Sequence, residues 1–344
     1  MALQGENQLG LKRLERLWAR GKDFLGTDFA IMGGAMTWVS DRNLVAAISN
    51  AGGFGVIACG SMTPDLLDDE IKGTQALTKK PFGVNLITLH PDMDALMDVC
   101  MDNKVSHIVL AGGLPPGNAI TRIKEGGALL MCFSPALSLA KKLIKSGVDA
   151  LIIEGAEAGG HIGPVSTAVL AQEILPHVES VPVFVAGGIG RGEAVASYLQ
   201  MGASGCQLGT RLVCATESRA HPKFKQAFFR ASARDAVPSI QLDPRFPVIP
   251  VRALKNEASE KFTECQRTTI SRFQKGDLSQ KEAQLEIERF WAGALRRAVM
   301  EGDIEGGSMM AGQSVGMVKE EQLVADIMTD LVNQAALFLE HASN

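Results

Sequence analysis

The stretch VPVFVAGGIGRGEAVASYLQMGASGCQLGT (residues 181–210) holds one complete repeat of the pattern that decides the fold. A short apolar run ends in a glycine pair, a helical segment follows, and a second apolar run ends in Gly-Thr. Neither run alternates between apolar and polar residues, which is typical of strands buried on both faces. The stretch therefore predicts a strand, a helix and a second strand parallel to the first.

The same unit recurs along the preceding sequence, so that eight apolar runs are present in all. They lie at residues 29–34, 54–60, 81–87, 105–112, 128–134, 150–155, 181–188 and 205–210. Their starts are 22 to 31 residues apart, the length that a strand and its following helix occupy. Eight successive units favour a closed (β/α)8 TIM barrel, with an open doubly wound sheet as the alternative.

Three segments are expected from this pattern. An N-terminal helical extension (1–28) precedes the barrel (29–215), and a helical region (216–344) packs beside the barrel mouth and completes the site. Within the last region, residues 278–301 and 319–341 are candidates for long amphipathic helices. The proline-rich residues 237–250 predict a loop, and the glycine-rich residues 302–316 are expected to fold back over the site.

Composition and charge exclude several classes of protein. With 46% hydrophobic and 21% charged residues, the chain has the composition of a globular protein. The net charge of −4 and the scattered Lys and Arg residues give no basic surface for nucleic acid. No apolar stretch reaches the roughly 18 to 20 residues of a membrane helix, and the polar N-terminus is unlike a signal peptide, so a cytoplasmic protein is expected. The six cysteines have no metal-ligand spacing, and no metal site is predicted.

Two glycine-containing loops follow the last two strands of the expected barrel. Gly187 and Gly188 lie in AGGIGRGE, and Thr210 ends QLGT. Phosphate groups are often bound by these two loops in TIM barrels, because glycine lets backbone N–H groups approach closely. The helix that begins near Arg191 is expected to add a favourable N-terminal dipole. Tight turns alone would explain one such loop, but two in adjacent units favour a phosphate site.

Polar side chains at other strand ends are further candidates. His161 lies in the glycine-rich loop after the sixth strand, where a near-neutral pKa suits proton transfer, although structural histidines are common. Glu154 and Glu157 could bind a ligand hydroxyl or brace this loop. Asn85, at the end of the third strand, could contact a polar cofactor ring or satisfy buried neighbours. From the residues alone, these alternatives remain open.

Sulphur-containing residues are weaker candidates. Met36, Met309 and Met310 could line an apolar pocket, although packing alone would explain them. Cys132 lies near the end of the fifth strand, but no base follows it at a useful spacing. We therefore interpret Cys132 as part of the core.

At these residues the chain resembles the superfamily of nitronate monooxygenases and enoyl-acyl-carrier-protein reductases II, FMN-dependent barrels once called 2-nitropropane dioxygenases. The most specific motif is EGAEAGGHIG (154–163), supported by SNAGGFGVI (49–57), KPFGVNL (80–86), AGGIG and QLGT. The resemblance implies FMN as cofactor and His161 as the catalytic residue. It implies that the cofactor-binding residues are Gly33, Asn85, Glu154, Gly159, Gly187, Gly188, Gln207, Leu208, Gly209 and Thr210.

Further stretches are similar to the reductase branch of this superfamily. They are ESRAHPKFK (217–225), VRALKN (251–256) and GDIEGGSMMAGQSVG (302–316). Glu154 agrees with them, since nitronate monooxygenases usually have glutamine there. The resemblance thus implies reduction of the 2,3 double bond of enoyl thioesters with NADH or NADPH, as in fatty acid biosynthesis. Acyl carrier protein and a second copy of the chain are the partners it suggests.

Other functions stay open at this point. The main alternative is nitronate monooxygenase activity, in which alkyl nitronates and oxygen are consumed. An NAD(P)H:quinone reductase and a non-catalytic barrel that binds a phosphorylated ligand are further alternatives. The first loop, MGGAMTWVSD (32–41), and the proline-rich segment are longer than in the reductase pattern, so specificity for acyl carrier protein does not follow from the resemblance.

Overall fold

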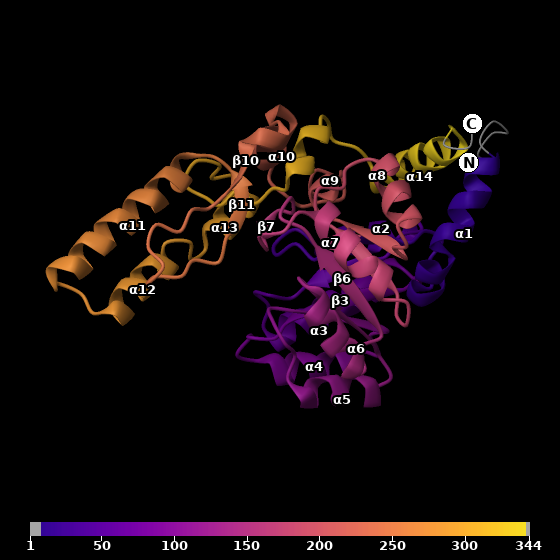
Figure 1. Cartoon of the computed structure of the whole chain (residues 1–344), viewed down its shortest axis with the longest axis horizontal. Coiled ribbons are helices and arrows are strands. Elements are labelled where there is room, and N and C mark those ends of the chain that lie inside the picture. Colours follow the sequence, from indigo (N-terminus) through magenta and orange to yellow (C-terminus); the bar gives the residue numbers. More distant parts are fainter. Residues whose placement is uncertain (1–7, 342–344) are drawn as a thin grey trace.

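An eight-stranded parallel barrel forms the centre of the molecule in this computed structural model, which describes residues 8–341 (Figure 1). The strands pair in the order β1-β9-β8-β6-β5-β4-β3-β2, and the amide of Gly33 donates to the carbonyl of Phe54 (2.8 Å) to join β1 to β2. The strands are β1 Ile31–Gly33, β2 Gly55–Ala58, β3 Phe82–Ile87, β4 His107–Ala111, β5 Leu129–Phe133, β6 Ala150–Glu154, β8 Val183–Ala186 and β9 Gly205–Leu208. Each of the eight predicted runs contains one of them, and the TIM barrel is confirmed.

Helices follow the barrel strands and cover the outside of the barrel. They are α2 Arg42–Asn50, α3 Pro64–Leu77, α4 Met93–Asp102, α5 Gly117–Glu125, α6 Leu137–Lys145, α7 Thr167–Ile174 with the 3-10 turn η1 Leu175–His177, α8 Gly192–Gln200 and the short α9 Thr210–Val213. Local signals place their starts: Asp41 accepts hydrogen bonds from the amides of Asn43 and Leu44 at the start of α2. No helix between residues 8 and 341 has the length and hydrophobicity that a bilayer span requires.

The C-terminal end of the N-terminal helix α1 (Gln8–Leu25) packs against the bottom of the barrel. Leu25 is fully buried among the side chains that fill the barrel interior. His107 lies with one ring nitrogen 2.9 Å from the carbonyl oxygen of Phe24, and the two rings pack edge to face. Burial lowers the pKa of His107. This end of the barrel is therefore filled by packed side chains, with His107 in a structural role.

The C-terminal helix α14 (Val324–His341) lies in the outer layer of the barrel, beside α1 and α8 (Figure 1). The helices approach very closely at two glycines. A Cβ atom on Gly10 would lie 2.0 Å from the carbonyl oxygen of Ala336, and one on Gly192 would lie 2.0 Å from that of Leu331. The region after residue 215 therefore divides, because α14 returns to the barrel while the other helices lie near the mouth.

Those other elements form the upper part of the molecule. They are α10 Pro222–Arg230, the 3-10 turn η2 Ala233–Asp235, the strands β10 Ala236–Pro238 and β11 Val251–Leu254, α11 Glu257–Lys275, α12 Gln280–Arg289, α13 Ala294–Arg296, the π-helical turn η3 Arg297–Glu301 and the 3-10 turn η4 Gln313–Met317. A second sheet joins β10, β11 and a two-residue strand, β7 Gly160–His161. The proline-rich stretch between β10 and β11 is irregular, as expected.

A helical arm, formed by α11 and α12, projects from the body of the molecule (Figure 1). Its small core is separate from that of the barrel and contains Phe246, Phe262, Ala283 and Ile287. Helix α11 was not predicted from the sequence, although Asn256 caps its start and Gly276 ends it with a φ of 84°. The prediction of one helix over residues 278–301 was wrong. That helix ends at Arg289, and Gly293 adopts a φ of 70° before α13 begins.

Candidate active site

A cavity of about 460 Å³ opens at the carboxyl ends of the barrel strands. Its lining includes His161 and nine of the ten predicted cofactor-binding residues. The exception is Gly33, whose neighbour Gly34 lines the cavity instead. A Cβ atom on Gly33 would lie 2.6 Å from Cδ1 of Ile48 on α2. Gly33 therefore allows β1 and α2 to pack closely, and the structure places it outside the cavity.

Two glycines after β8 give one wall of the cavity. Gly187 and Gly188 have φ values of 97° and 72°, a left-handed conformation that residues with a Cβ atom rarely adopt. A Cβ atom on Gly187 would also lie 2.9 Å from Oγ1 of Thr167. The backbone can follow this path only with glycine, and it leaves the chain uncovered by side chains at the cavity wall.

The helix expected to help bind phosphate does not reach the cavity. The amide of Gly192, at the start of α8, donates to Oε1 of Gln334 on α14 (2.9 Å), and Arg191 forms an ion pair with Glu193. Neither Arg191 nor Gly192 lines the cavity, and the effect of this helix dipole on a phosphate stays a prediction. Thr210 does line the cavity, and it begins the short helix α9 directly after β9.

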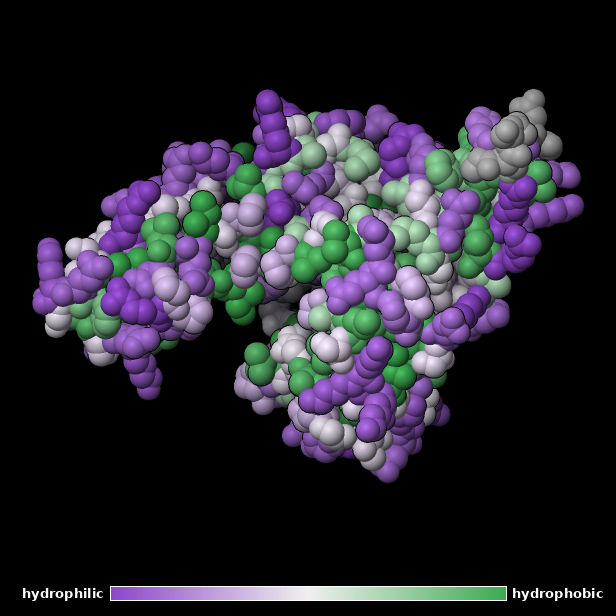
Figure 2. Space-filling model, viewed as in Figure 1, coloured by the Kyte–Doolittle hydropathy of each residue, from purple (hydrophilic) through white to green (hydrophobic). Residues whose placement is uncertain are grey.

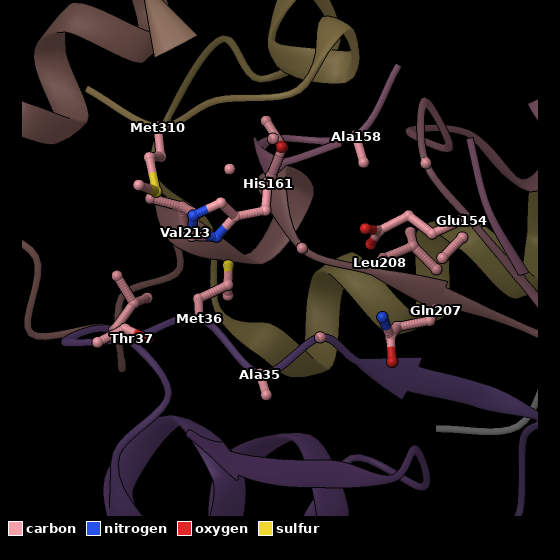
Figure 3. A pocket seen from close by; sticks show the side chains of 18 of the residues that line it. Ala35, Met36, Thr37, Glu154, Ala158, His161, Gln207, Leu208, Val213 and Met310 are labelled. Atoms are coloured by element: carbon pink, nitrogen blue, oxygen red, sulfur yellow. The ribbon is translucent and has the colours of Figure 1, made fainter. Parts of the chain in front are cut away.

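Three polar side chains form the floor of the cavity, and we call Asn85, Glu154 and Gln207 the polar floor. Glu154 and Gln207 pair in register with Ala186, on the strand between them. Because Ala186 belongs to the barrel interior, residues in register with it point inward as well. Figure 3 shows both side chains projecting into the cavity.

The polar floor is poorly satisfied by the protein. Asn85 donates from Nδ2 to the carbonyl of Val109 (3.1 Å). Within residues 8–341, no hydrogen bond is found for the Glu154 carboxyl group or the Gln207 side-chain amide. Burial raises the pKa of Glu154 to about 7. Both side chains line the cavity, so their polar atoms are free to hydrogen-bond a polar ligand there.

His161 is held at the cavity by the C-terminal part of the chain. In β7 it pairs with Val251, and Gly160 pairs with Arg252. Arg252 is buried, and it donates from Nε to the carbonyl of Ala156 (2.8 Å) and from Nη1 to that of Ala236 (2.5 Å). Arg252 was not among the residues predicted from the sequence. Residues 251–254 (VRAL) alternate between half-buried and buried positions. This alternation arises only when β11 pairs with its partner strands, so the sequence alone does not reveal it.

The ring of His161 lies beside Met36, Met310 and Val213 at the cavity (Figure 3). Within the described chain, no hydrogen bond is found for either ring nitrogen. Burial of the ring lowers the pKa of His161, which favours the neutral imidazole. A neutral imidazole carries one N–H donor and one nitrogen acceptor, and both are free to meet a ligand. Of the three methionines considered, Met309 does not line the cavity.

We call the loop after β6 that contains His161 (residues 155–163) the histidine loop. Glu157 braces this loop and does not line the cavity. Its Oε2 accepts from the amide and from Oγ1 of Thr167 (both 2.9 Å). Its backbone carbonyl accepts from the amide of Gln313 (2.9 Å), and the amide of Gly312 donates to Oγ1 of Thr210 (2.9 Å). The stretch 302–316 thus folds against the histidine loop, as expected.

The remaining wall is apolar and comes from segments far apart in the sequence. It includes Ile87, Phe133, Val213, Phe224, Leu295 and Val299. These residues were not predicted from the sequence, because no local pattern distinguishes them from other core positions. They make the cavity suited to a ligand with a large apolar surface.

Comparison with known proteins agrees with this geometry. The family model of nitronate monooxygenases matches residues 19–97 and 92–334. A (3aS,4S,5R,7aS)-5-hydroxy-7a-methyl-1-oxo-octahydro-1H-indene-4-carboxyl-CoA dehydrogenase of Mycobacterium tuberculosis is 28% identical over 93% of this chain and 97% of its own length. A nitronate monooxygenase of Paraburkholderia phytofirmans is 29% identical over 61% of this chain and 70% of its own length.

Solved structures show the same relationship. FabK from Thermotoga maritima is 36% identical and covers 94% of this chain and 98% of its own, with a TM-score of 0.85. A nitroalkane oxidase from Streptomyces ansochromogenes is 25% identical and covers 94% and 99%, with a TM-score of 0.76. The chain therefore belongs to the nitronate monooxygenase family, a family of FMN-dependent oxidoreductases.

Proposed function

We propose that this protein uses FMN and NADH or NADPH to reduce the 2,3 double bond of enoyl thioesters. The observation that carries this proposal is the ring of His161, which has no protein partner among residues 8–341 and lies at a cavity with a polar floor and an apolar wall. Support for the reductase reaction comes from FabK, an enoyl reductase, to which the chain is 36% identical over nearly its whole length.

The cavity has the groups that FMN would need. Gly187, Gly188 and Thr210 offer uncovered backbone and a hydroxyl group to a phosphate. Glu154 and Gln207 lack partners within the described chain, so they can hydrogen-bond the polar edge of a flavin ring. The apolar wall suits the rest of that ring. Gly33 lies outside the cavity, and its neighbour Gly34 takes its place in the lining.

His161 would act on the thioester rather than on the cofactor. Bound FMN would supply hydride transfer between the nicotinamide and the β-carbon of the substrate. The neutral His161 ring can donate its N–H to the thioester carbonyl oxygen, which stabilises negative charge that develops there. Alternatively, His161 could deliver this proton to the α-carbon and recover it from water. The pairing of β7 with β11 keeps the ring in place for either role.

A thioester substrate also agrees with the M. tuberculosis relative, whose name describes a dehydrogenase of a carboxyl-CoA compound. Its substrate, as named, carries a large fused-ring group next to the thioester. The cavity here has an apolar wall, and Figure 2 shows a hollow with hydrophobic residues at its edges between the arm and the barrel. We propose that the acyl part of the substrate enters from this side.

The test separates the two half-reactions. The purified protein is loaded with FMN, reduced anaerobically with NADH or NADPH, and then mixed with crotonyl or longer enoyl thioesters while flavin absorbance is followed. We expect reoxidation of the flavin by the thioester. His161→Ala should keep reduction by the nicotinamide and lose reoxidation, whereas His177→Ala, at an exposed position, should retain both. Reduced flavin that enoyl thioesters fail to reoxidise would overturn the proposal.

Nitronate monooxygenase activity is the second candidate. It is favoured by the family match over most of the chain and by the P. phytofirmans relative of that name. An alkyl nitronate has already lost the proton of the carbon next to the nitro group, so no base is needed, and the N–H of His161 could donate a hydrogen bond to an oxygen of the nitronate. Oxygen consumption with ethyl nitronate or propionate 3-nitronate, without any nicotinamide, distinguishes it from the reductase.

A further inference from the structure

Glu154 is half-buried and lines the cavity, and it differs from the buried acids of this protein. Asp41 and Glu70 are buried, and both have partners. Glu70 accepts from the amide, Nε and Nη2 of Arg42 at 2.7 to 3.1 Å. Asp41 caps α2 and lies 3.7 Å from Arg219. Glu154, at the end of β6, has neither a cation nor a hydrogen-bond donor among residues 8–341.

The described surroundings of Glu154 contain no positive charge to hold it ionised. Its in-register neighbours on the next two strands are Ala186 and the neutral Gln207. The cavity lining, as far as the structure describes it, contains no Lys or Arg, and its other titratable group is His161, whose pKa is lowered by burial. The carboxylate of Glu157 is bound to Thr167 instead.

Arg252, a buried cation of the C-terminal region, is engaged by other groups. Arg252 donates to the carbonyl oxygens of Ala156 and Ala236. Its electrostatic partner is Glu157, and Glu154 is not among the groups that act on it. The described elements packed around Glu154 therefore provide no charge that would favour the carboxylate over the acid.

We propose that Glu154 binds the cofactor as a neutral carboxylic acid, donating its own proton in a hydrogen bond to an acceptor atom of the flavin. This inference rests on the proposed binding of FMN. The neighbouring Gln207 amide can donate or accept, so the pair can match an edge on which donors and acceptors lie side by side. Burial alone raises the pKa of Glu154 to about 7, and donation to a bound acceptor raises it further.

The neutral acid also suits the reduced cofactor. A bound flavin that accepted hydride, which is two electrons and one proton, would carry one additional negative charge on its ring. An ionised Glu154 would place a second negative charge beside it in a buried site. The protonated acid places a donor there instead. Through this direct hydrogen bond, Glu154 would favour the reduced flavin.

The affinity for FMN should depend on pH, because Glu154 must carry its carboxyl proton when the cofactor is bound. Below the pKa of the free protein, about 7, Glu154 is protonated with and without cofactor, and affinity is highest. Above that value the acid must take up a proton when FMN binds. Affinity should therefore fall by up to tenfold per pH unit as the pH rises above about 7.

The first test is the dissociation constant of FMN, measured by flavin fluorescence from roughly pH 6 to pH 9 at constant ionic strength. We expect the wild-type affinity to fall across this range. Glu154→Gln should bind with an affinity that does not change with pH, because its amide donates at every pH. Glu157→Gln, which changes the other acid of the same loop, should keep the wild-type slope even if the loop is weakened.

The second test detects the protonated carboxyl group of Glu154 by infrared spectroscopy. An infrared spectrum of the wild-type holoenzyme should contain a protonated carboxyl band that is absent from Glu154→Gln. The midpoint potential of the bound flavin should also lose its pH dependence from this group in the variant. A wild-type affinity that is constant with pH, or a carboxyl band that survives in the variant, would overturn the proposal. Failure of FMN to bind at low pH would instead refute the proposed cofactor.

Discussion

Replacing Gly159 with alanine tests how the C-terminal region holds the site. A Cβ atom there would lie 2.5 Å from the amide nitrogen of Gly312 and 2.7 Å from the carbonyl carbon of Ala311. Both are backbone atoms, so no side chain can rotate out of the way. The histidine loop and the 302–316 stretch would have to separate, and the bond from Gly312 to Thr210 would weaken.

The magnitude follows from three effects. Overpacking in a well-packed region costs about 1 to 3 kcal/mol. Loss of one buried hydrogen bond costs about 1 kcal/mol. Alanine restricts the unfolded chain more than glycine does, which returns about 0.4 to 1 kcal/mol. The free energy of unfolding should therefore fall by about 2 kcal/mol in Gly159→Ala.

Gly163 provides a matched control in the same loop. No atom lies within 4 Å of a Cβ placed on it, and its φ is outside the left-handed region. Gly163→Ala should leave stability unchanged or raise it by up to about 1 kcal/mol. Urea unfolding of the two variants beside the wild type measures the difference. Equal stability of Gly159→Ala and Gly163→Ala would show that the close backbone contact does not hold the loop.

Three further predictions concern other parts of the molecule. In the cofactor-free protein, Glu154→Gln should raise the free energy of unfolding by up to about 3 kcal/mol above pH 7, because the pKa of Glu154 is about 7 in the fold and returns to its ordinary value of 4.5 on unfolding. This gain should disappear below about pH 4.5, where the acid is neutral in both states, and urea unfolding at several pH values would reveal it. Arg252→Met should cost about 2 to 4 kcal/mol, since two buried carbonyl groups lose their donor, and hydrogen exchange should increase in the histidine loop. Exposed Arg234→Met is its control. Phe262→Ala should cost the arm about 3 to 5 kcal/mol, with faster amide exchange in α11 and α12 and unchanged exchange in the barrel.

The barrel could be predicted because its information is local. Each strand is a short apolar run, each is followed by a helix signal, and the spacing repeats eight times. The ends of parallel strands must meet at one end of a barrel. That rule brings Asn85, Glu154 and Gln207 together without any knowledge of their neighbours. Which of them lack partners could not be predicted, because this depends on the side chains opposite.

The helical arm and the pairing of β7 with β11, which holds His161, could not be predicted from local sequence patterns. The apolar pattern of residues 278–301 favours one continuous helix, but the structure has two. The left-handed φ of Gly293 interrupts the helix before α13. Likewise, β7 has only two residues and exists because β11, some 90 residues later in the chain, pairs with it. Neither strand has a length that sequence periodicity can detect.

The position of α14 between α1 and α8 has a consequence for synthesis on the ribosome. While the nascent chain emerges, all eight barrel strands become available long before this helix does. Until then the surface that α14 covers on α1 and α8 stays open to water, and the buried residues of α14, among them Ile327, Leu331 and Leu339, are not yet in place. Helix α14 is therefore the last part of the outer layer to be added during translation. A chaperone that covers the exposed surface of α1 and α8 until α14 is synthesised would protect the folding barrel.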